Sequence, residues 1–517
     1  MSKKLVRSGL IVSAMTLISR VLGLVRDVVV ANLMGAGAAA DVFFLANKIP
    51  NFLRRLFAEG AFAQAFVPVL SEYQHDKPDQ VRQLVAKVSG TLGTIITVVT
   101  LLGVIGSPVI AALFGTGWFI DWLNDAPGGE KFTLAALMLK ITFPYLWFIT
   151  LTALSGAILN TLGRFAVAAF TPVFLNVAII ACALWLAPQL AQPELALAWG
   201  VFLGGLIQFL FQIPFLYRNK MLVRPQWGWH DPGVKKIRTL MIPAMFGVSV
   251  SQINLLFDTL IASFLMTGSI SWLYYSDRLL EFPLGLFGIA IATVILPALS
   301  RNQAAADPKQ FARTMDWGVR SVLLVGIPAM LGLMVLAQPM LMVLFMRGAF
   351  SVADSQMAAM SLLAYASGLL SFMLVKVLAP GYYARQDTKT PVRYGIIAMV
   401  ANMGFNVALA IPFGYVGLAL ATAASATLNA GLLYRGLVQQ RVYQVSQQSG
   451  RLIGKMVVAG AVMATTVWWL SPAEAVWLAW GLAERSLWLF TYIGAGVATY
   501  LASLLLLGLR PRHLRAA

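Results

Sequence analysis

Windows of about twenty apolar residues recur along the whole chain, and each is long enough to cross a lipid bilayer as a helix. We place fourteen such windows, which cover residues 8–34, 38–72, 88–114, 132–159, 166–187, 195–217, 239–265, 271–300, 318–346, 356–383, 392–411, 414–434, 452–470 and 486–509. Of the 517 residues, 59% are hydrophobic and 11% are charged, which is too apolar for a soluble protein of this size. The sequence therefore predicts an all-α polytopic membrane protein with fourteen transmembrane helices.

Lysine and arginine are distributed unevenly between the predicted loops. If the N-terminus lies in the cytoplasm, the loops on the outer side carry only Lys131, Arg347 and Arg485, and the cytoplasmic loops carry nearly all the other basic residues. This bias follows the positive-inside rule. We therefore expect both termini in the cytoplasm. Most of the net charge of +18 is then an orientation signal, and we expect no nucleic-acid partner.

Short sequence pairs recur in the two halves of the chain. AFVPVLS at residues 65–71 resembles TVILPALS at residues 293–300, and SPVIAALFGTG resembles QPMLMVLFMRG. Four such pairs keep the same order and are separated by roughly 223 to 231 positions, which is typical of a duplication. We predict two six-helix lobes around a central cavity, at residues 1–220 and 221–445, with two further helices at residues 446–517.

Charged residues interrupt several of the apolar spans. A charge near the bilayer centre costs roughly 2.5 to 3.5 kcal/mol on insertion scales, so these side chains are expected to line a wet interior. The cations that we select as substrate-binding candidates are Arg20, Arg26, Arg54 and Arg278. The acids that we select as cavity or ion-coupling candidates are Asp27, Asp41, Glu59, Asp277 and Glu281.

Arginine is suited to an anionic ligand because its guanidinium group stays charged and binds phosphate or carboxylate oxygens in a bidentate fork. The neighbouring acids either pair with the arginines in the empty site or bind a coupling cation, and the sequence does not choose between these roles. Two structural alternatives remain open. Arg26 and Asp27 can form an ion pair without further function, and Lys48 and Arg55 can extend to the membrane interface.

Signatures of catalysis are absent from the sequence. It contains no glycine-rich phosphate loop with a following Lys and Ser/Thr, and no Ser/His/Asp set within reach. The histidines His75, His230 and His513 are far apart, and the single Cys182 lies within an apolar run. We therefore expect no catalytic residue, no metal site and no cofactor. Transport would depend on an ion gradient, the membrane potential or the gradient of the substrate, and the coupling cation is not identified.

Several long motifs resemble those of one family. These are SRVLGLVRD, GAGAAADVFFLANKIPNFLRRLFAEGAFAQAFVPVLSEY, WLYYSDRLLEFPLGLFG and APGYYARQDTKTP. Together with the fourteen-span pattern, they closely resemble the MurJ (MviN) family. Its members are lipid II flippases of the multidrug/oligosaccharidyl-lipid/polysaccharide exporter superfamily, and the resemblance covers essentially the whole chain.

The resemblance implies a protein of the bacterial cytoplasmic (inner) membrane. It would move lipid II, the undecaprenyl-diphosphate-linked disaccharide pentapeptide, from the inner to the outer leaflet by alternating access, for cell wall biogenesis. The implied partners are lipid II, membrane lipids and the cell-wall synthesis machinery, and helices 13 and 14 would form a groove for the lipid tail. The family's cavity arginines match Arg20, Arg26, Arg54 and Arg278, and its cavity acids match the five acids selected above.

Three other functions remain as alternatives. One is an exporter of another ligand, either a drug cation or a different polyprenyl-linked glycan. A cation exporter should have a cavity dominated by carboxylates and aromatic rings, whereas this one has at least as many arginines. A membrane-integral cell-wall enzyme would need catalytic acids in large outer loops, and these loops offer little beyond Asp121, Asp125 and Glu130. A structural scaffold would leave the intramembrane charges unexplained.

Overall fold

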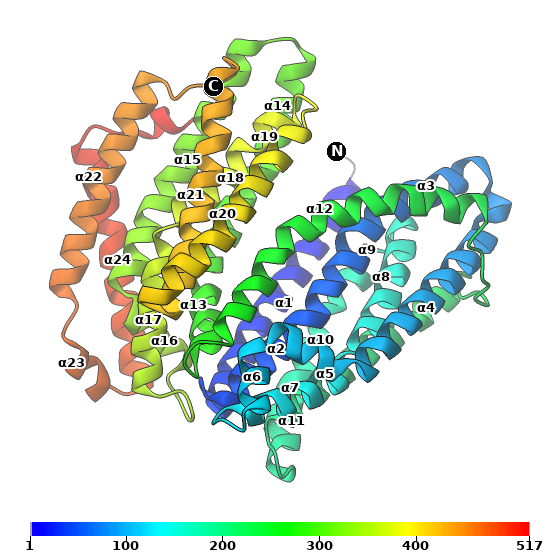
Figure 1. The fold of residues 1–517 in the computed structure, drawn as a ribbon. Helices are drawn as coiled ribbons and strands as arrows, with labels where there is room; N and C mark the ends of the chain where they lie inside the picture. Colours follow the sequence, from blue (N-terminus) through cyan, green and yellow to red (C-terminus); the bar gives the residue numbers. More distant parts are fainter. Residues whose placement is uncertain (1–2, 516–517) are drawn as a thin grey trace. The chain divides into compact units, whose positions relative to one another are not determined.

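The structure, a computed structural model, describes residues 3–515, apart from the side chains of Leu5, Ala58, Glu59, Gly60, Ser251 and Ile289. Throughout this range every regular element is a helix (Figure 1). Twelve helices in it are long and apolar enough to cross a membrane, and the bent helix α12 (Pro232–Ala262) would be a thirteenth. The prediction of an all-α polytopic membrane protein is confirmed, and the count of fourteen spans stays a prediction.

The chain divides into two compact units. The first comprises Met1–Ser271 and Arg347–Phe350, and the second comprises Trp272–Met346 and Ser351–Ala517. This division falls later in the chain than the predicted boundary at residues 220/221, because α12 packs along α3 (Ala61–Asp76) of the first unit. The prediction of two six-helix lobes rests on the duplicated sequence pairs, and it stays a prediction.

The first unit contains most of the elements up to α12. Its helices are α1 (Lys3–Met34), α2 (Ala38–Arg54), η1 (Arg55–Gly60), α3, η2 (Pro78–Gln80), α4 (Val81–Ile105), α5 (Ser107–Phe114), α6 (Thr116–Leu123), α7 (Gly129–Thr142), α8 (Tyr145–Thr161), α9 (Phe165–Phe170), α10 (Pro172–Ala181), η3 (Cys182–Leu186), η4 (Ala187–Gln189), α11 (Leu195–Arg218) and α12. Several predicted spans therefore consist of two or more helical segments rather than one continuous helix. The span predicted at 38–72 consists of α2, the π-helical turn η1 and α3.

The second unit begins within α13, and its helices are α13 (Ser269–Pro283), η5 (Leu284–Gly288), α14 (Ile289–Ala304), α15 (Pro308–Val335), α16 (Ala337–Phe345), α17 (Val352–Ala366), α18 (Leu369–Leu378), α19 (Pro380–Tyr383), α20 (Lys389–Phe413), α21 (Tyr415–Gln439), α22 (Gln447–Leu470), α23 (Glu474–Ala479), α24 (Leu482–Leu506) and η6 (Pro511–Leu514). Helices α22 and α24 lie side by side, and both pack against α15 (Figure 1). The residues predicted as helices 13 and 14 are therefore an integral part of this unit.

Helix starts follow local sequence signals. Pro232 and Pro308 occupy the first helical positions of α12 and α15, where the missing N–H costs nothing. Asp231 accepts hydrogen bonds from the first free N–H groups of α12, and Asp307 does the same for α15. Helix α17 begins with a capping box in which Ser351 pairs with the third helical residue. Local chemistry therefore sets these boundaries.

A buried carboxylate anchors the C-terminal helices of the second unit. Asp316 of α15 accepts hydrogen bonds from Tyr443 at 2.9 Å and from the Ser446 hydroxyl at 2.7 Å, and it also accepts one from Ser449. Burial, reinforced by the Asp316 carboxylate, raises the pKa of the Tyr443 phenol above its usual range, so this group remains a hydrogen donor. The segment that leads into α22 is thereby tied to α15.

Gly35 follows the last residue of α1, and the backbone of Ala349 approaches it closely. Its φ is +58°, and a Cβ at this position would lie 2.3 Å from the carbonyl oxygen of Ala349. We expect Gly35→Ala to lower the free energy of unfolding by at least roughly 1 to 3 kcal/mol, the usual cost of a strained backbone. Thermal unfolding can be followed by the reaction of the buried Cys182 with a thiol-reactive dye.

Gly9→Ala is the matched control for Gly35→Ala. Gly9 lies in α1, the helix that Gly35 follows, and a Cβ there would meet nothing within 4 Å. Because alanine favours the helix, the unfolding temperature of this variant should be unchanged or higher. Equal losses of stability in the two variants would contradict the structural role given to Gly35.

Candidate functional site

Arg26 and Asp27 form an ion pair about two turns before the end of α1. The Nε and Nη2 atoms of Arg26 donate to Oδ1 of Asp27 at 3.3 and 3.1 Å, and Nη1 donates to Oδ1 of Asn176 on α10 at 3.0 Å. Asn176 donates in turn to the carbonyl oxygen of Ser19 at 3.2 Å. The Asp27 side chain is 1% exposed, whereas that of Arg26 is 20% exposed. The structure therefore holds this guanidinium group in a fixed orientation with an accessible edge.

Arg20 lies about two helical turns before Asp27 on the same face of α1. Its side chain is exposed, and it forms no hydrogen bond or ion pair with any residue that the structure describes. A guanidinium group with no protein partner is available to an anion. Of the three candidate arginines in the first unit, Arg20 is thus the one whose guanidinium group is not bound to a described protein side chain.

Two of the cations of α2 and η1 bond to residues of α12. Lys48 donates to the hydroxyl of Thr259 at 3.0 Å, and Arg55 donates to the side-chain carbonyl of Gln252 at 2.9 Å. Arg54 donates from Nε to Asn51 of its own helix at 3.3 Å. The partners on α12 were not selected from the sequence. The side chain of Glu59, a predicted cavity acid, lies outside the described residues.

Asp41 is buried at the first turn of α2, with 2% of its surface exposed. Its carboxylate accepts hydrogen bonds from the backbone N–H of Gly268 at 2.7 Å and from the backbone N–H and hydroxyl of Ser271 at 3.0 and 2.6 Å. These bonds fasten the loop that follows α12. The geometry therefore gives Asp41 a structural role, and we do not propose it as a ligand-binding group.

The candidate residues of the second unit lie on α13. Arg278 donates to Glu281, one turn further along, at 2.9 Å. Their side chains are 28% and 52% exposed, and Asp277 is half-buried beside them. This pair resembles the Arg26–Asp27 pair in kind, because each sets an accessible guanidinium group against a carboxylate. The convergence of all four arginines on one cavity stays a prediction.

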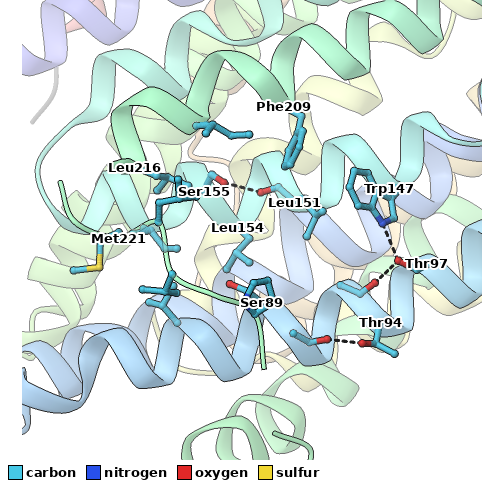
Figure 2. Close-up of a pocket in the computed structure, with 18 of the residues that line it drawn as sticks. Ser89, Thr94, Thr97, Trp147, Leu151, Leu154, Ser155, Phe209, Leu216 and Met221 are labelled. Carbon is cyan, nitrogen blue, oxygen red and sulfur yellow. Dashed lines mark hydrogen bonds between the residues drawn. The ribbon is translucent and has the colours of Figure 1, made fainter. Parts of the chain in front are cut away.

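A separate cavity of about 520 Å³ opens in the first unit between α4, α8, α11 and the extended segment 221–229. Figure 2 shows that several of its polar groups are hydrogen-bonded within the protein, since Trp147 donates to Thr97 at 2.8 Å and Ser155 donates to the carbonyl oxygen of Leu151 at 3.0 Å. The described residues of its lining are apolar or neutral, and none is charged. This cavity cannot neutralise an anion, so it is not the candidate substrate site.

Comparison with known proteins agrees with the fold. The family model described as "Lipid II flippase MurJ" matches residues 30–487. A probable lipid II flippase MurJ of Vibrio cholerae serotype O1 is 69% identical over 518 residues, covering 100% of this chain and 98% of the relative. The corresponding protein of Haemophilus influenzae is 62% identical over 507 residues, covering 97% and 99%. The lipid II flippase MurJ of Burkholderia cenocepacia is 40% identical over 470 residues, covering 90% of each chain.

Solved structures support the same architecture. A lipid II flippase MurJ in an inward closed conformation superimposes with a TM-score of 0.80 at 27% identity, covering 96% of this chain and 98% of that chain. An inward-facing multidrug transporter of the MATE family superimposes with a TM-score of 0.68 at 12% identity, covering 84% and 98%. The second similarity shows the fold alone.

Proposed function

Because the chain belongs to the MurJ family of lipid II flippases, we propose that it moves lipid II from the inner to the outer leaflet of a bacterial cytoplasmic membrane for cell wall biogenesis. The protein is a transporter rather than an enzyme. The observation that carries the proposal is the intramembrane pair of Arg26 and Asp27, oriented by Asn176. Such a charge is costly in a membrane helix and is expected to serve a ligand.

The diphosphate of the precursor is the group that these arginines would receive. Phosphate oxygens accept two parallel hydrogen bonds from one guanidinium group, which an ammonium group cannot provide. In the empty site the Asp27 carboxylate neutralises Arg26. When the diphosphate enters, it competes with Asp27 for Arg26 and binds the exposed Arg20, while Arg54 and Arg278 supply further positive charge. The lipid tail remains in apolar surroundings throughout.

The acids have a second role in this proposal. Asp27, Asp277 and Glu281 keep Arg26 and Arg278 neutralised between substrates, which lowers the cost of moving these two arginines when the empty protein changes conformation. No group of three or more His, Cys, Asp or Glu side chains suited to a metal ion occurs among the described residues. We propose no cofactor, and the energy would come from an ion gradient, the membrane potential or the gradient of the precursor.

The same proposal includes the topology of the chain, the place of the lipid tail and the partners of the protein. Both termini would lie in the cytoplasm, as the distribution of basic residues predicts. Helices α22 and α24 would hold the polyprenyl tail, and translocation would proceed by alternating access. Delivery and use of the precursor would involve the cell-wall synthesis machinery as a partner. Export of drugs or of another polyprenyl-linked glycan is not favoured by any of the relatives.

Genetic replacement tests the proposed function. Cells depleted of their own lipid II flippase should survive and keep their shape when this chain is expressed, and they should lyse with an empty vector. Arg20→Gln and Arg278→Gln variants should fail to rescue growth, although membrane fractions contain them at wild-type levels. Lysis in the presence of well-expressed wild-type protein would contradict the proposal.

A further inference from the structure

The second unit contains a pocket of about 560 Å³ where α22 ends and the chain turns into α23. Its walls come from α15, α16, α17, α22 and α23. The polar and aromatic side chains on which the argument depends are Gln338, Gln356, Trp468, Ser471, Glu474 and Trp477. None of these residues belongs to the candidate site for the precursor.

Several polar groups of this pocket are bonded to one another within the protein. Nε2 of Gln356 donates to Oε1 of Glu474 at 2.6 Å, and Nε1 of Trp477 donates to the Ser471 hydroxyl at 3.3 Å. Nε2 of Gln338 donates to the Ser355 hydroxyl at 3.4 Å, and this hydroxyl is itself engaged as a donor to the carbonyl oxygen of Val352. The indole N–H of Trp477 is thus used, and each glutamine amide keeps one further N–H.

Acceptors remain available in the same pocket. Oε2 of Glu474 and the side-chain carbonyl oxygens of Gln338 and Gln356 accept no hydrogen bond from any described residue. These three acceptors include a carboxylate oxygen, and they outnumber the two remaining amide N–H groups. A primary ammonium group, which has three N–H donors and no acceptor, fits such a set.

Charge and aromatic character agree with this fit. Glu474 is the only charged side chain among the described residues that line the pocket, so the pocket has a net negative charge. The Trp468 ring is 71% exposed, and it stacks on no other ring in the described part of the chain. An exposed indole face attracts ammonium groups through its π electrons. The pocket therefore favours a cationic ligand.

We infer that this pocket binds the ethanolamine headgroup of a phospholipid from the leaflet that it faces. Trp468 and Trp469, 71% and 77% exposed, lie at the end of α22, which we predict to be at the outer interface, where tryptophan is enriched. Met360 and Leu363 of α17, 51% and 43% exposed, provide an apolar wall for the attached chains. The inference does not depend on the proposed function.

The test compares two lipids that differ in their headgroup donors. The full-length protein is reconstituted in bilayers with a fixed anionic fraction and equal amounts of phosphatidylethanolamine and phosphatidylcholine. Lipids that remain bound after mild detergent extraction are counted by native mass spectrometry. Choline keeps the positive charge but has no N–H group, so the wild type should retain phosphatidylethanolamine roughly tenfold better.

Glu474→Gln should bring the retention of the two lipids close to equality. Glu484→Gln is the matched control, because this exposed acid of α24 does not line the pocket. If Glu474→Gln fails to fold, Gln338→Leu removes one acceptor and leaves the contact between Glu474 and Gln356 intact. Equal retention by the wild type, or an unchanged preference in Glu474→Gln or Gln338→Leu, would overturn the inference. Displacement of the lipid by an equal concentration of soluble phosphoethanolamine would also overturn it.

Discussion

Arg26→Lys is expected to slow precursor translocation roughly tenfold to a hundredfold while the protein still folds and inserts. Lysine keeps the positive charge beside the buried Asp27, so the carboxylate is not left without a cation. Its single nitrogen cannot reproduce the planar arrangement in which Nε and Nη2 contact Asp27 while Nη1 contacts Asn176, at 3.0 to 3.3 Å. The loss of one or two hydrogen bonds to a charged group accounts for the expected factor.

The rate of Arg26→Lys can be measured with reconstituted protein and a fluorescent precursor whose outer-face population is read by a membrane-impermeant quencher. Arg164→Lys is the matched control, because Arg164 is exposed in a predicted cytoplasmic loop and has no partner among the described residues. The control should flip precursor at the wild-type rate. If Arg26→Lys flipped precursor at the wild-type rate, the hydrogen-bond geometry of the guanidinium group would not be needed for translocation.

Asp41→Ala is expected to destabilise the first unit by roughly 2 to 6 kcal/mol. The substitution leaves the buried N–H groups of Gly268 and Ser271 without an acceptor, and each such group costs roughly 1 to 3 kcal/mol. Asp41→Asn keeps one acceptor oxygen and should lose less. Thermal unfolding followed through Cys182, which lies in the same unit, measures the difference.

The control for Asp41→Ala is Asp79→Ala, since Asp79 is exposed and forms no hydrogen bond or ion pair with the residues that the structure describes. It should unfold at the wild-type temperature. If Asp41→Ala matched this control in stability and yet stopped transport, Asp41 would be an ion-coupling acid, as its position among the intramembrane charges first suggested, and not a structural residue.

The apolar windows predicted the helices well because burial in a bilayer imposes the same average hydropathy on every span. They could not show where a span breaks, because a window of about twenty residues averages over a bend. The span predicted at 88–114 is in fact α4 followed by α5, with the break at Gly106. Hydropathy also carries no information on packing, so the sequence did not reveal that α12 joins the first unit.

The partners of the candidate residues were predictable only where they are neighbours in the chain. Arg26 with Asp27 and Arg278 with Glu281 are local pairs that the spacing of charges revealed. Asn176, Gln252 and Thr259 are uncharged polar residues within predicted membrane spans, and such residues often bond only to their own helix. Thr259 does this too, by donating to the carbonyl oxygen of Leu255, which is why the type of residue alone could not identify it.

The most direct test of the central claim is to measure how much lipid-linked precursor reaches the outer leaflet of living cells. Three strains are compared, which express the wild type, Arg26→Lys or no flippase. The account predicts outer-leaflet precursor with the wild type, much less with Arg26→Lys, and accumulation on the inner face without the protein. Equal amounts on the outer face in all three strains would show that the intramembrane arginines serve some other ligand.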